Sequence, residues 1–131
     1  MKLRTTLAAL ALVAATPAFA ADPAVGTYKT QPDDNGNFGH VELYECDGGN
    51  ICGVIRKAFD GSGSEIASQN IGKMMIWDMA ADGGGSYSGG KIWAPDRDKV
   101  YNSKMEMSGN TLKVSGCVAI ICRAQSWTKL N

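Results

Sequence analysis

Short segments of alternating apolar and polar residues follow one another along the chain after residue 20. Leu112, Val114 and Gly116, for example, alternate with polar neighbours, as a strand with one buried face requires. Clusters of Gly, Pro, Asn, Asp and Ser separate the segments at a spacing that is too short for helices and typical of β-strands joined by turns. The pattern predicts strands at Val25–Thr30, Phe38–Cys46, Ile51–Ala58, Lys73–Met79, Ser86–Trp93, Lys99–Met107, Thr111–Val118 and Cys122–Leu130.

Most connections between the predicted strands are short, which favours an antiparallel up-and-down arrangement. Glycine supplies 16 of the 131 residues, about 12% where roughly 7% is usual, and glycine inside a helix is destabilising. Eight antiparallel strands can close into a barrel, and closure removes the exposed sheet edges. The predicted fold is therefore one all-β domain, an antiparallel up-and-down eight-stranded barrel.

The N-terminal segment has a different pattern. Two basic residues precede an apolar run, Leu7–Ala15, and Ala18–Ala20 provide the small residues of a cleavage site. Nine apolar residues span about 14 Å as a helix, far less than the roughly 30 Å of a hydrocarbon core. We therefore expect a secretory signal peptide cleaved before Ala21, and a periplasmic or secreted bacterial domain, residues 21–131, without a membrane span.

Four cysteines form two closely spaced pairs, Cys46 with Cys52 and Cys117 with Cys122. Such pairs can bind zinc, but the spacings of five and four residues exceed the two that the tightest zinc knuckles use. Export to an oxidising compartment favours disulfides instead. Four cysteines allow three connectivities.

Strand register favours one of these connectivities. If the cysteines of each pair face each other, favourable side-chain pairs also face each other on the same strands. These pairs are Tyr44 with Val54, Glu42 with Arg56, Leu112 with Trp127 and Thr111 with Thr128. The prediction is a disulfide within each hairpin, Cys46–Cys52 and Cys117–Cys122.

Several segments, in this order and spacing, resemble the bacterial family known as domain of unknown function 2147. They are Val41–Cys46 with Ile51–Ile55, Gly90–Pro95 with Tyr101, Leu112–Cys117 and Cys122–Thr128. The resemblance implies an exported domain with a lipocalin-like (calycin-like) barrel and no established activity. Calycins commonly begin with Gly-x-Trp and pack that ring against an arginine of the last strand. Gly26, Tyr28 and Arg123 occupy these places, with tyrosine where tryptophan is usual.

Alternation along the last strand assigns its side chains to two faces. With the cysteines outward, Arg123, Gln125 and Trp127 point into the barrel. Tyr28 is the ring that the resemblance places on Arg123, and Glu45, inward by alternation, is a candidate counter-charge. Two roles for Arg123 remain open, a pin that closes one barrel end or, with Gln125, a polar anchor for an anionic ligand.

The predicted turn between the last two strands consists only of apolar residues, Val118, Ala119, Ile120 and Ile121. Hairpin turns rarely have this composition, because Gly, Asn, Asp and Ser suit turn backbones best. Either other loops cover the turn, or it is a contact site.

Charge and candidate chemistry narrow the functional classes. With 13 basic and 13 acidic residues, the chain lacks the positive footprint of proteins that bind nucleic acid or anionic membranes. His40, the only histidine, is assigned to the solvent face and is not expected to act as a catalytic base. Asp33, Asn35 and Asn37 begin like a calcium loop, but the required glycine and glutamate are missing. We expect no metal, no cofactor and no enzymatic activity.

The resulting prediction is a non-catalytic domain that binds a small molecule inside its barrel. An eight-stranded barrel is just wide enough for side chains or one small ligand, so the same fold can also be filled. The alternatives are a structural or interaction protein of the cell envelope with a filled barrel and, less favoured, an enzyme of unrecognised type.

Overall fold

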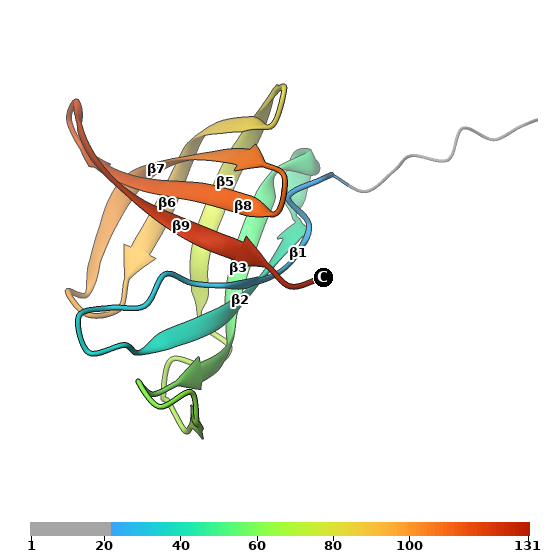
Figure 1. Ribbon diagram of the computed structural model, residues 1–131. Coiled ribbons are helices and arrows are strands. Elements are labelled where there is room, and N and C mark those ends of the chain that lie inside the picture. The colour runs from blue at the N-terminus through green and yellow to red at the C-terminus, as the bar shows by residue number, and fades with distance from the viewer. Residues whose placement is uncertain (1–21) are drawn as a thin grey trace, which may run out of the picture.

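The computed structural model describes residues 22–131, and the predicted signal peptide with its cleavage point before Ala21 lies outside the described residues. Strands dominate this range, and one short 3-10 helix follows the second strand (Figure 1). The elements are β1 (Gly26–Lys29), β2 (Phe38–Glu45), η1 (Asp47–Gly49), β3 (Ile51–Phe59), β4 (Glu65–Ile66), β5 (Met74–Gly83), β6 (Ser86–Ala94), β7 (Lys99–Ser108), β8 (Thr111–Val118) and β9 (Ile121–Lys129).

All predicted strands are present, with two notable differences. β5 continues to Gly83, beyond its predicted end at Met79, because its last residues pair with the start of β6. β4 is absent from the sequence prediction and pairs with the end of β3, Ala58 with Ile66. Both differences depend on pairing with a neighbouring strand. Neither segment has an alternating pattern of apolar and polar residues from which the pairing could be predicted.

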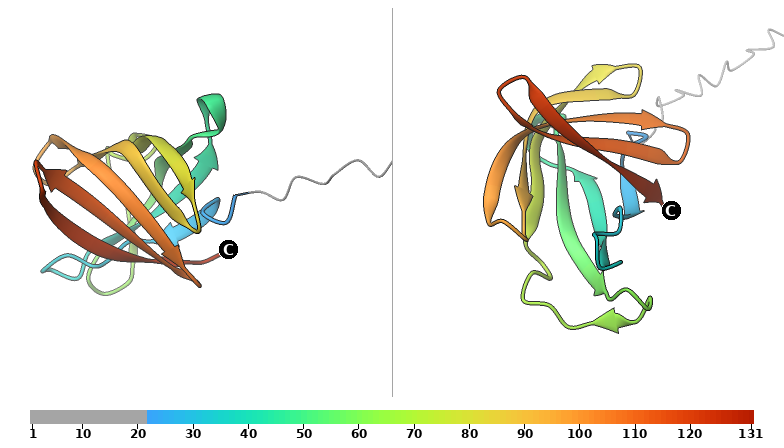
Figure 2. Two further views of the ribbon diagram at one scale, coloured as in Figure 1. Left: turned by 90° about the horizontal axis from the view of Figure 1, so that it is seen from above. Right: turned by 60° about the vertical axis from the view of Figure 1, so that its left-hand side comes forward.

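The strands form the predicted antiparallel up-and-down barrel of eight strands, to which β4 is appended (Figure 2). Each barrel strand pairs with the barrel strand that follows it in the chain. β3 therefore pairs directly with β5, and the last strand, β9, pairs with β1 and closes the barrel. The closing contact is short, with the residue pairs Tyr28–Lys129 and Lys29–Thr128. The first half of β9 therefore pairs with β8 alone.

The predicted register is correct for one hairpin and wrong for the other. In β8 and β9, Cys117 pairs with Cys122 and Gly116 with Arg123, as predicted. In β2 and β3 the pairing is displaced by two residues, so that Tyr44 lies opposite Cys52 instead of Val54. Both disulfides are nevertheless present as predicted.

The turn after β2 explains the displaced register. Cys46 follows the last residue pair of the hairpin, Glu45 with Ile51, and the glycines of η1 adopt positive φ values that fit a wider turn. The Cα atoms of Cys46 and Cys52 are still 5.8 Å apart, within the range that a disulfide spans. A disulfide therefore fixes which cysteines are neighbours, but not whether they are directly opposite.

Glu42 and Arg56 still meet, although they are not directly opposite. Glu42 pairs with Val54, and a β-bulge between His40 and Val41 shifts the register beside it. The Arg56 Nε atom lies 3.0 Å from Glu42 Oε2. Both side chains are about half exposed, so this ion pair contributes little to stability.

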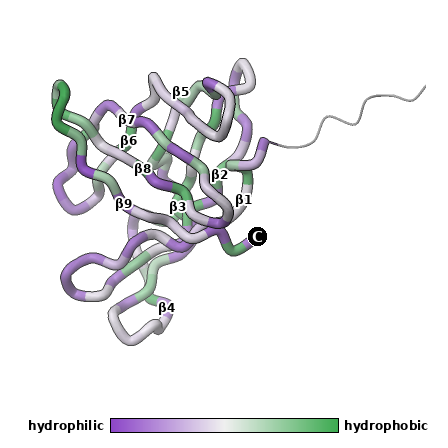
Figure 3. The backbone as a smooth tube through the Cα atoms, turned by 45° about the horizontal axis from the view of Figure 1, so that its top comes forward, coloured by the Kyte–Doolittle hydropathy of each residue, from purple (hydrophilic) through white to green (hydrophobic). Residues whose placement is uncertain are grey.

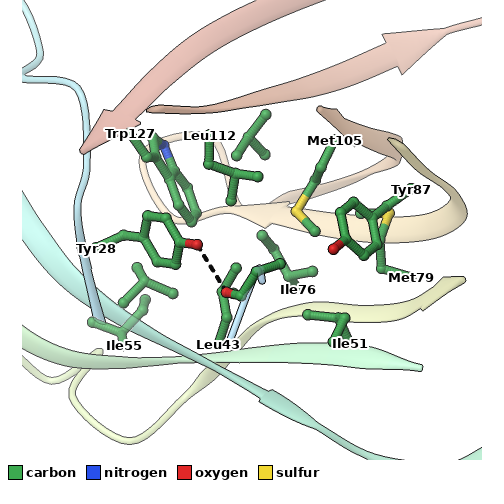
Figure 4. Packing of buried hydrophobic residues seen from close by; sticks show 13 residues of the cluster. Tyr28, Leu43, Ile51, Ile55, Ile76, Met79, Tyr87, Met105, Leu112 and Trp127 are labelled. Atoms are coloured by element: carbon green, nitrogen blue, oxygen red, sulfur yellow. Dashed lines mark hydrogen bonds between the residues drawn. The ribbon is translucent and has the colours of Figure 1, made fainter. Parts of the chain in front are cut away.

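The hydrophobic core fills one half of the barrel (Figure 4). Its largest fully buried side chains are Trp127, Tyr28, Leu43, Ile51, Ile76, Met79, Leu112 and Val41. These side chains come from six of the eight barrel strands, and Met105 of β7, in the same cluster, adds a seventh. This half of the interior is solid.

Residues 22–25 close the barrel at the filled half, which we call the closed end. Ala24 is fully buried and its carbonyl accepts a hydrogen bond from the Tyr28 hydroxyl at 2.9 Å (dashed line in Figure 4). The Tyr87 hydroxyl donates to the Asp22 carboxylate. The segment that follows the predicted cleavage site is therefore part of the fold.

Candidate functional site

The interior changes from filled to open along the last hairpin. The inward positions of β8 run from Leu112 and Val114, which are 0% and 2% exposed, to Val118, which is 64% exposed. In β9 the fully buried Trp127 gives way to the exposed Gln125 and Arg123. We call the end reached in this direction, where residues 95–98 and 119–120 connect the strands, the open end.

A cavity of about 540 Å³ lies in the open half of the barrel, against the inner face of β5 to β9. Its lining is mostly apolar and also includes basic, acidic and amide side chains. The lining residues are Met75, Ile92, Ala94, Pro95, Asp96, Arg97, Lys99, Tyr101, Val114, Gly116, Val118, Ile121, Arg123 and Gln125. Pockets for small molecules commonly have volumes of about 300–1,000 Å³.

A second, smaller depression of about 260 Å³ lies over β6, β7 and β8. Its lining is mainly polar and includes Lys104, Lys113 and Ser115, which alternate with core residues along their strands. Its volume lies below the usual range of small-molecule sites. The larger cavity is therefore the candidate site.

Two predicted polar residues line the candidate cavity. Arg123 is exposed, and the ion pairs of the described residues, Arg56–Glu42 and Lys57–Glu65, do not include it. Gln125 lies one inward position deeper, where its Oε1 atom accepts a hydrogen bond from Trp127 Nε1 at 3.1 Å. Gln125 thus connects the core with the cavity.

The expected packing of Arg123 on Tyr28 is wrong. Tyr28 pairs with Lys129, which lies six residues along β9 from Arg123 and so about 20 Å away. Tyr28 instead lies beside Trp127 in the core (Figure 4). Arg123 is on the inward face of β9 but exposed, because the barrel interior is open to solvent at the level of this residue. Its exposure is therefore compatible with the predicted register.

Glu45 is not the counter-charge of Arg123. It is exposed at the closed end, where its carboxylate accepts the backbone N–H of Asp22 at 3.4 Å. Arg123 belongs to the open half. Alternation assigned a face to each residue but gave no height along the barrel axis.

Two tyrosines at the closed end have raised pKa values. Burial, aided by the negative charge of Asp22, raises the pKa of Tyr28 to about 12. Burial and the hydrogen bond to Asp22 raise the pKa of Tyr87 as well. Neither group lines the larger cavity and both stay protonated at neutral pH, so they belong to the core.

The turn between β8 and β9 is uncovered. Val118, Ile120 and Ile121 are 64%, 96% and 73% exposed, and the turn is the strongly green segment at the upper left of Figure 3. Ala119, between them, adopts a positive φ of 54°. Of the two alternatives for this turn, cover by other loops is wrong, and Val118 and Ile121 also line the cavity.

The cavity offers little of the chemistry that catalysis by a side chain needs. None of the described residues that line it is a Ser, Thr, Cys or His. His40 lies outside the lining and packs against Phe59, with ring centroids 4.5 Å apart. Desolvation and the charge of Lys57 lower its pKa. Within residues 22–131 there is no group of three His, Cys, Asp or Glu side chains suited to a metal ion.

Arg97, Lys99 and Tyr101 also line the cavity, although sequence reasoning did not assign them to a site. Arg97 lies in a polar turn, where a charged residue carries no functional signal. Tyr101 pairs with Ile92 across β6 and β7, so alternation together with the register would have placed it inside. The sequence could not show that these strands enclose empty space.

Comparison with known proteins identifies the family and the fold. The family described as "Uncharacterized protein conserved in bacteria (DUF2147)" matches residues 26–129. The solved structure of protein HP1028 from the human pathogen Helicobacter pylori, described as a member of the lipocalin family, superposes with a TM-score of 0.66. At 19% sequence identity, the match covers 86% of this chain and 85% of that chain, and it shows a shared lipocalin-like fold. No curated protein sequence matches the chain.

In the part of the chain that the structure describes, no helix is long and apolar enough to cross a membrane. The family match extends from the first residue of β1 to the last residue of β9, and thus takes in the whole barrel and the cavity. The chain therefore belongs to the DUF2147 family of uncharacterised bacterial proteins and has a lipocalin-like barrel.

Proposed function

We propose that the protein binds a small molecule in the cavity at its open end and catalyses no reaction. The observation that carries this proposal is the cavity of about 540 Å³ beside a solid core. A barrel whose only role is structural gains stability by filling its interior with side chains. The lining also lacks a nucleophile paired with a base, which supports binding over catalysis.

We also propose that the protein acts in the periplasm or outside the cell. The basic, apolar and small-residue pattern of residues 1–20 supports export. The two disulfides support an oxidising compartment, since disulfides are rare in the bacterial cytosol.

Filling the cavity with a side chain is expected to abolish binding. A Cβ atom on Gly116 would lie 3.5 Å from Ile92 and Tyr101, an ordinary contact distance, so Gly116→Phe can place its ring in the cavity without a backbone clash. We expect its affinity for a neutral apolar fluorophore, N-phenyl-naphthylamine, to fall by about tenfold or more, because the ring takes the ligand's volume. Fluorescence titration measures the affinity, and thermal melting checks the fold.

Lys113→Phe is the matched control, since it adds the same ring to the exposed face of the same strand. Native mass spectrometry of protein from the periplasm should find co-purified mass on the wild type and on Lys113→Phe, but not on Gly116→Phe. Equal fluorophore affinities in all three proteins would contradict binding in the cavity.

A second candidate function is contact with another envelope component through the turn of residues 118–121. The exposure of Ile120, at 96%, is the specific observation that favours it. Contiguous exposed apolar residues are typical of interaction sites. This function is compatible with ligand binding, because the turn borders the cavity.

Replacing Ile120 with serine is expected to change the free energy of unfolding by no more than about 0.5 kcal/mol, because the side chain has almost no packing to lose. Urea unfolding followed by circular dichroism measures this change. A loss of about 2 kcal/mol or more, as large-to-small changes in a core produce, would show that the turn is packed and would remove the argument for a contact site.

A further inference from the structure

We propose that the ligand is an amphipathic anion, whose acidic head group is bound by Arg123 and whose apolar part lies against Val114 and Ile92. This inference rests on the proposed function, and it adds the chemical class of the ligand. The head group is a carboxylate, sulfonate or phosphate, since all three present oxygen atoms that match a guanidinium.

The charge of the cavity lining is the first argument. Apart from Lys2 and Arg4 of the N-terminal segment, the chain has 11 basic residues, which is 13 minus 2, against 13 acidic ones. The cavity lining reverses this balance, with Arg97, Lys99 and Arg123 against Asp96. A concave site with one sign of charge and apolar walls concentrates ligands of the opposite sign.

The availability of Arg123 is the second argument. No ion pair among the described residues involves a basic residue of the cavity lining. Gly116, the cross-strand partner of Arg123, has no side chain to cover the guanidinium. A cation at the edge of an apolar cavity, without an acidic partner, is a fixed positive charge that an incoming anion can neutralise.

Gln125 adds directionality. Its Oε1 atom accepts the hydrogen bond from Trp127 Nε1, which leaves the amide N–H groups as its free donors. Arg123 carries only donors as well. Two neighbouring inward positions of β9 thus offer donors without a competing acceptor, which suits an anion and disfavours a cation.

The apolar part of the cavity is the third argument. Val114 is 2% exposed and Ile92 is half-buried, and Met75 completes the wall from β5. Ile92 lies beside Gly116, the cross-strand partner of Arg123, and Val114 lies one inward position deeper. A molecule with one charged end and one apolar end therefore finds a partner for each end within the same cavity.

The test compares two ligands that differ only in charge. Decanoate and decanol share the same alkyl chain, and each is titrated against the bound neutral fluorophore at pH 7.5. We expect the wild-type protein to bind decanoate about tenfold more tightly than decanol, the gain expected from one charge-assisted hydrogen-bonding contact. Arg123→Met should lose this preference while its affinity for decanol and its melting temperature stay unchanged.

Two further variants complete the design. Lys113→Met removes one positive charge from the outer face of β8 and should keep the preference for decanoate. Arg123→Lys keeps the charge but loses the guanidinium fork, so its preference should be intermediate.

The results that would overturn the proposal are distinguishable. Equal affinities for decanoate and decanol in the wild type, or an equal loss of both in Arg123→Met, would refute the anionic ligand and leave cavity binding intact. If neither compound displaces the fluorophore, and the fluorophore binds Gly116→Phe as well as wild type, the proposed function fails together with its ligand class. A lowered melting temperature of Arg123→Met would indicate the structural pin instead.

Discussion

Replacing Trp127 with alanine is expected to lower the free energy of unfolding by about 3–5 kcal/mol, the usual cost of removing a large aromatic side chain from a core. Domains of this kind are stable by only about 5–15 kcal/mol. Trp127 is fully buried, lies opposite Leu112 and neighbours Tyr28 at the closed end (Figure 4). The variant is therefore expected to be marginally folded.

Trp127 belongs to the core and also contacts a residue of the cavity lining. Its indole N–H donates to Gln125, so the substitution also frees the Gln125 side chain. The rigid strands around it cannot collapse into the space that the indole leaves. We therefore expect weaker ligand binding along with the loss of stability.

Urea unfolding followed by circular dichroism measures the change, and Trp77→Ala is the matched control. Trp77 follows the inward Ile76 in β5, so its half-buried ring lies on the other face of the strand. Its loss should cost clearly less than the loss of Trp127. Similar unfolding midpoints for the two variants would show that Trp127 does not anchor the core.

Raising the pH from 10 to 12 is expected to lower the free energy of unfolding by about 2 kcal/mol through Tyr28 alone. The folded protein holds the pKa of Tyr28 at about 12, while the unfolded chain has the ordinary value of 10.0. The stabilisation is therefore fully present below pH 10 and is lost as the pH rises through 12. Tyr87, whose pKa is also raised, adds to this loss.

Unfolding free energies measured in urea across this pH range test the prediction. Tyr28→Phe and Tyr87→Phe should each make the alkaline decline shallower, because phenylalanine has no proton to release. Tyr28→Phe also loses the hydrogen bond to Ala24, so its stability at neutral pH should fall by about 1 kcal/mol. Tyr44→Phe, on the outer face of β2, is the control. If the unfolding free energy of the Tyr28 and Tyr87 variants falls as steeply with pH as that of this control, the assignment of the alkaline decline to the two tyrosines is contradicted.

The alternating pattern and the turn clusters were sufficient to predict the fold. Alternation depends only on the two-residue period of a strand, so it reveals each strand whose two faces differ in polarity. The register of β8 and β9 was also predictable, because a short turn and a facing cysteine pair leave one arrangement that matches the apolar residues. The register of β2 and β3 was not, because the glycines of η1 widen the turn by an amount that sequence does not specify.

The candidate site could be predicted only in part. Alternation placed Arg123 and Gln125 on the inner face of β9, and both line the cavity. It could not show that Tyr28 lies at the other end of the barrel, nor that Arg97 and Lys99 join Arg123 at the open end.

Sequence by itself therefore determined the eight barrel strands, the barrel class, both disulfides and the face that each side chain of the last hairpin presents. These are local properties, fixed by neighbours along one strand or across one turn. The height of a residue in the barrel, the exposure of Ile120 and the existence of the cavity were decided by the tertiary structure. These three features depend on how far strands from distant parts of the chain extend past one another. The contact between β1 and β9 is short, and one half of the barrel is therefore open.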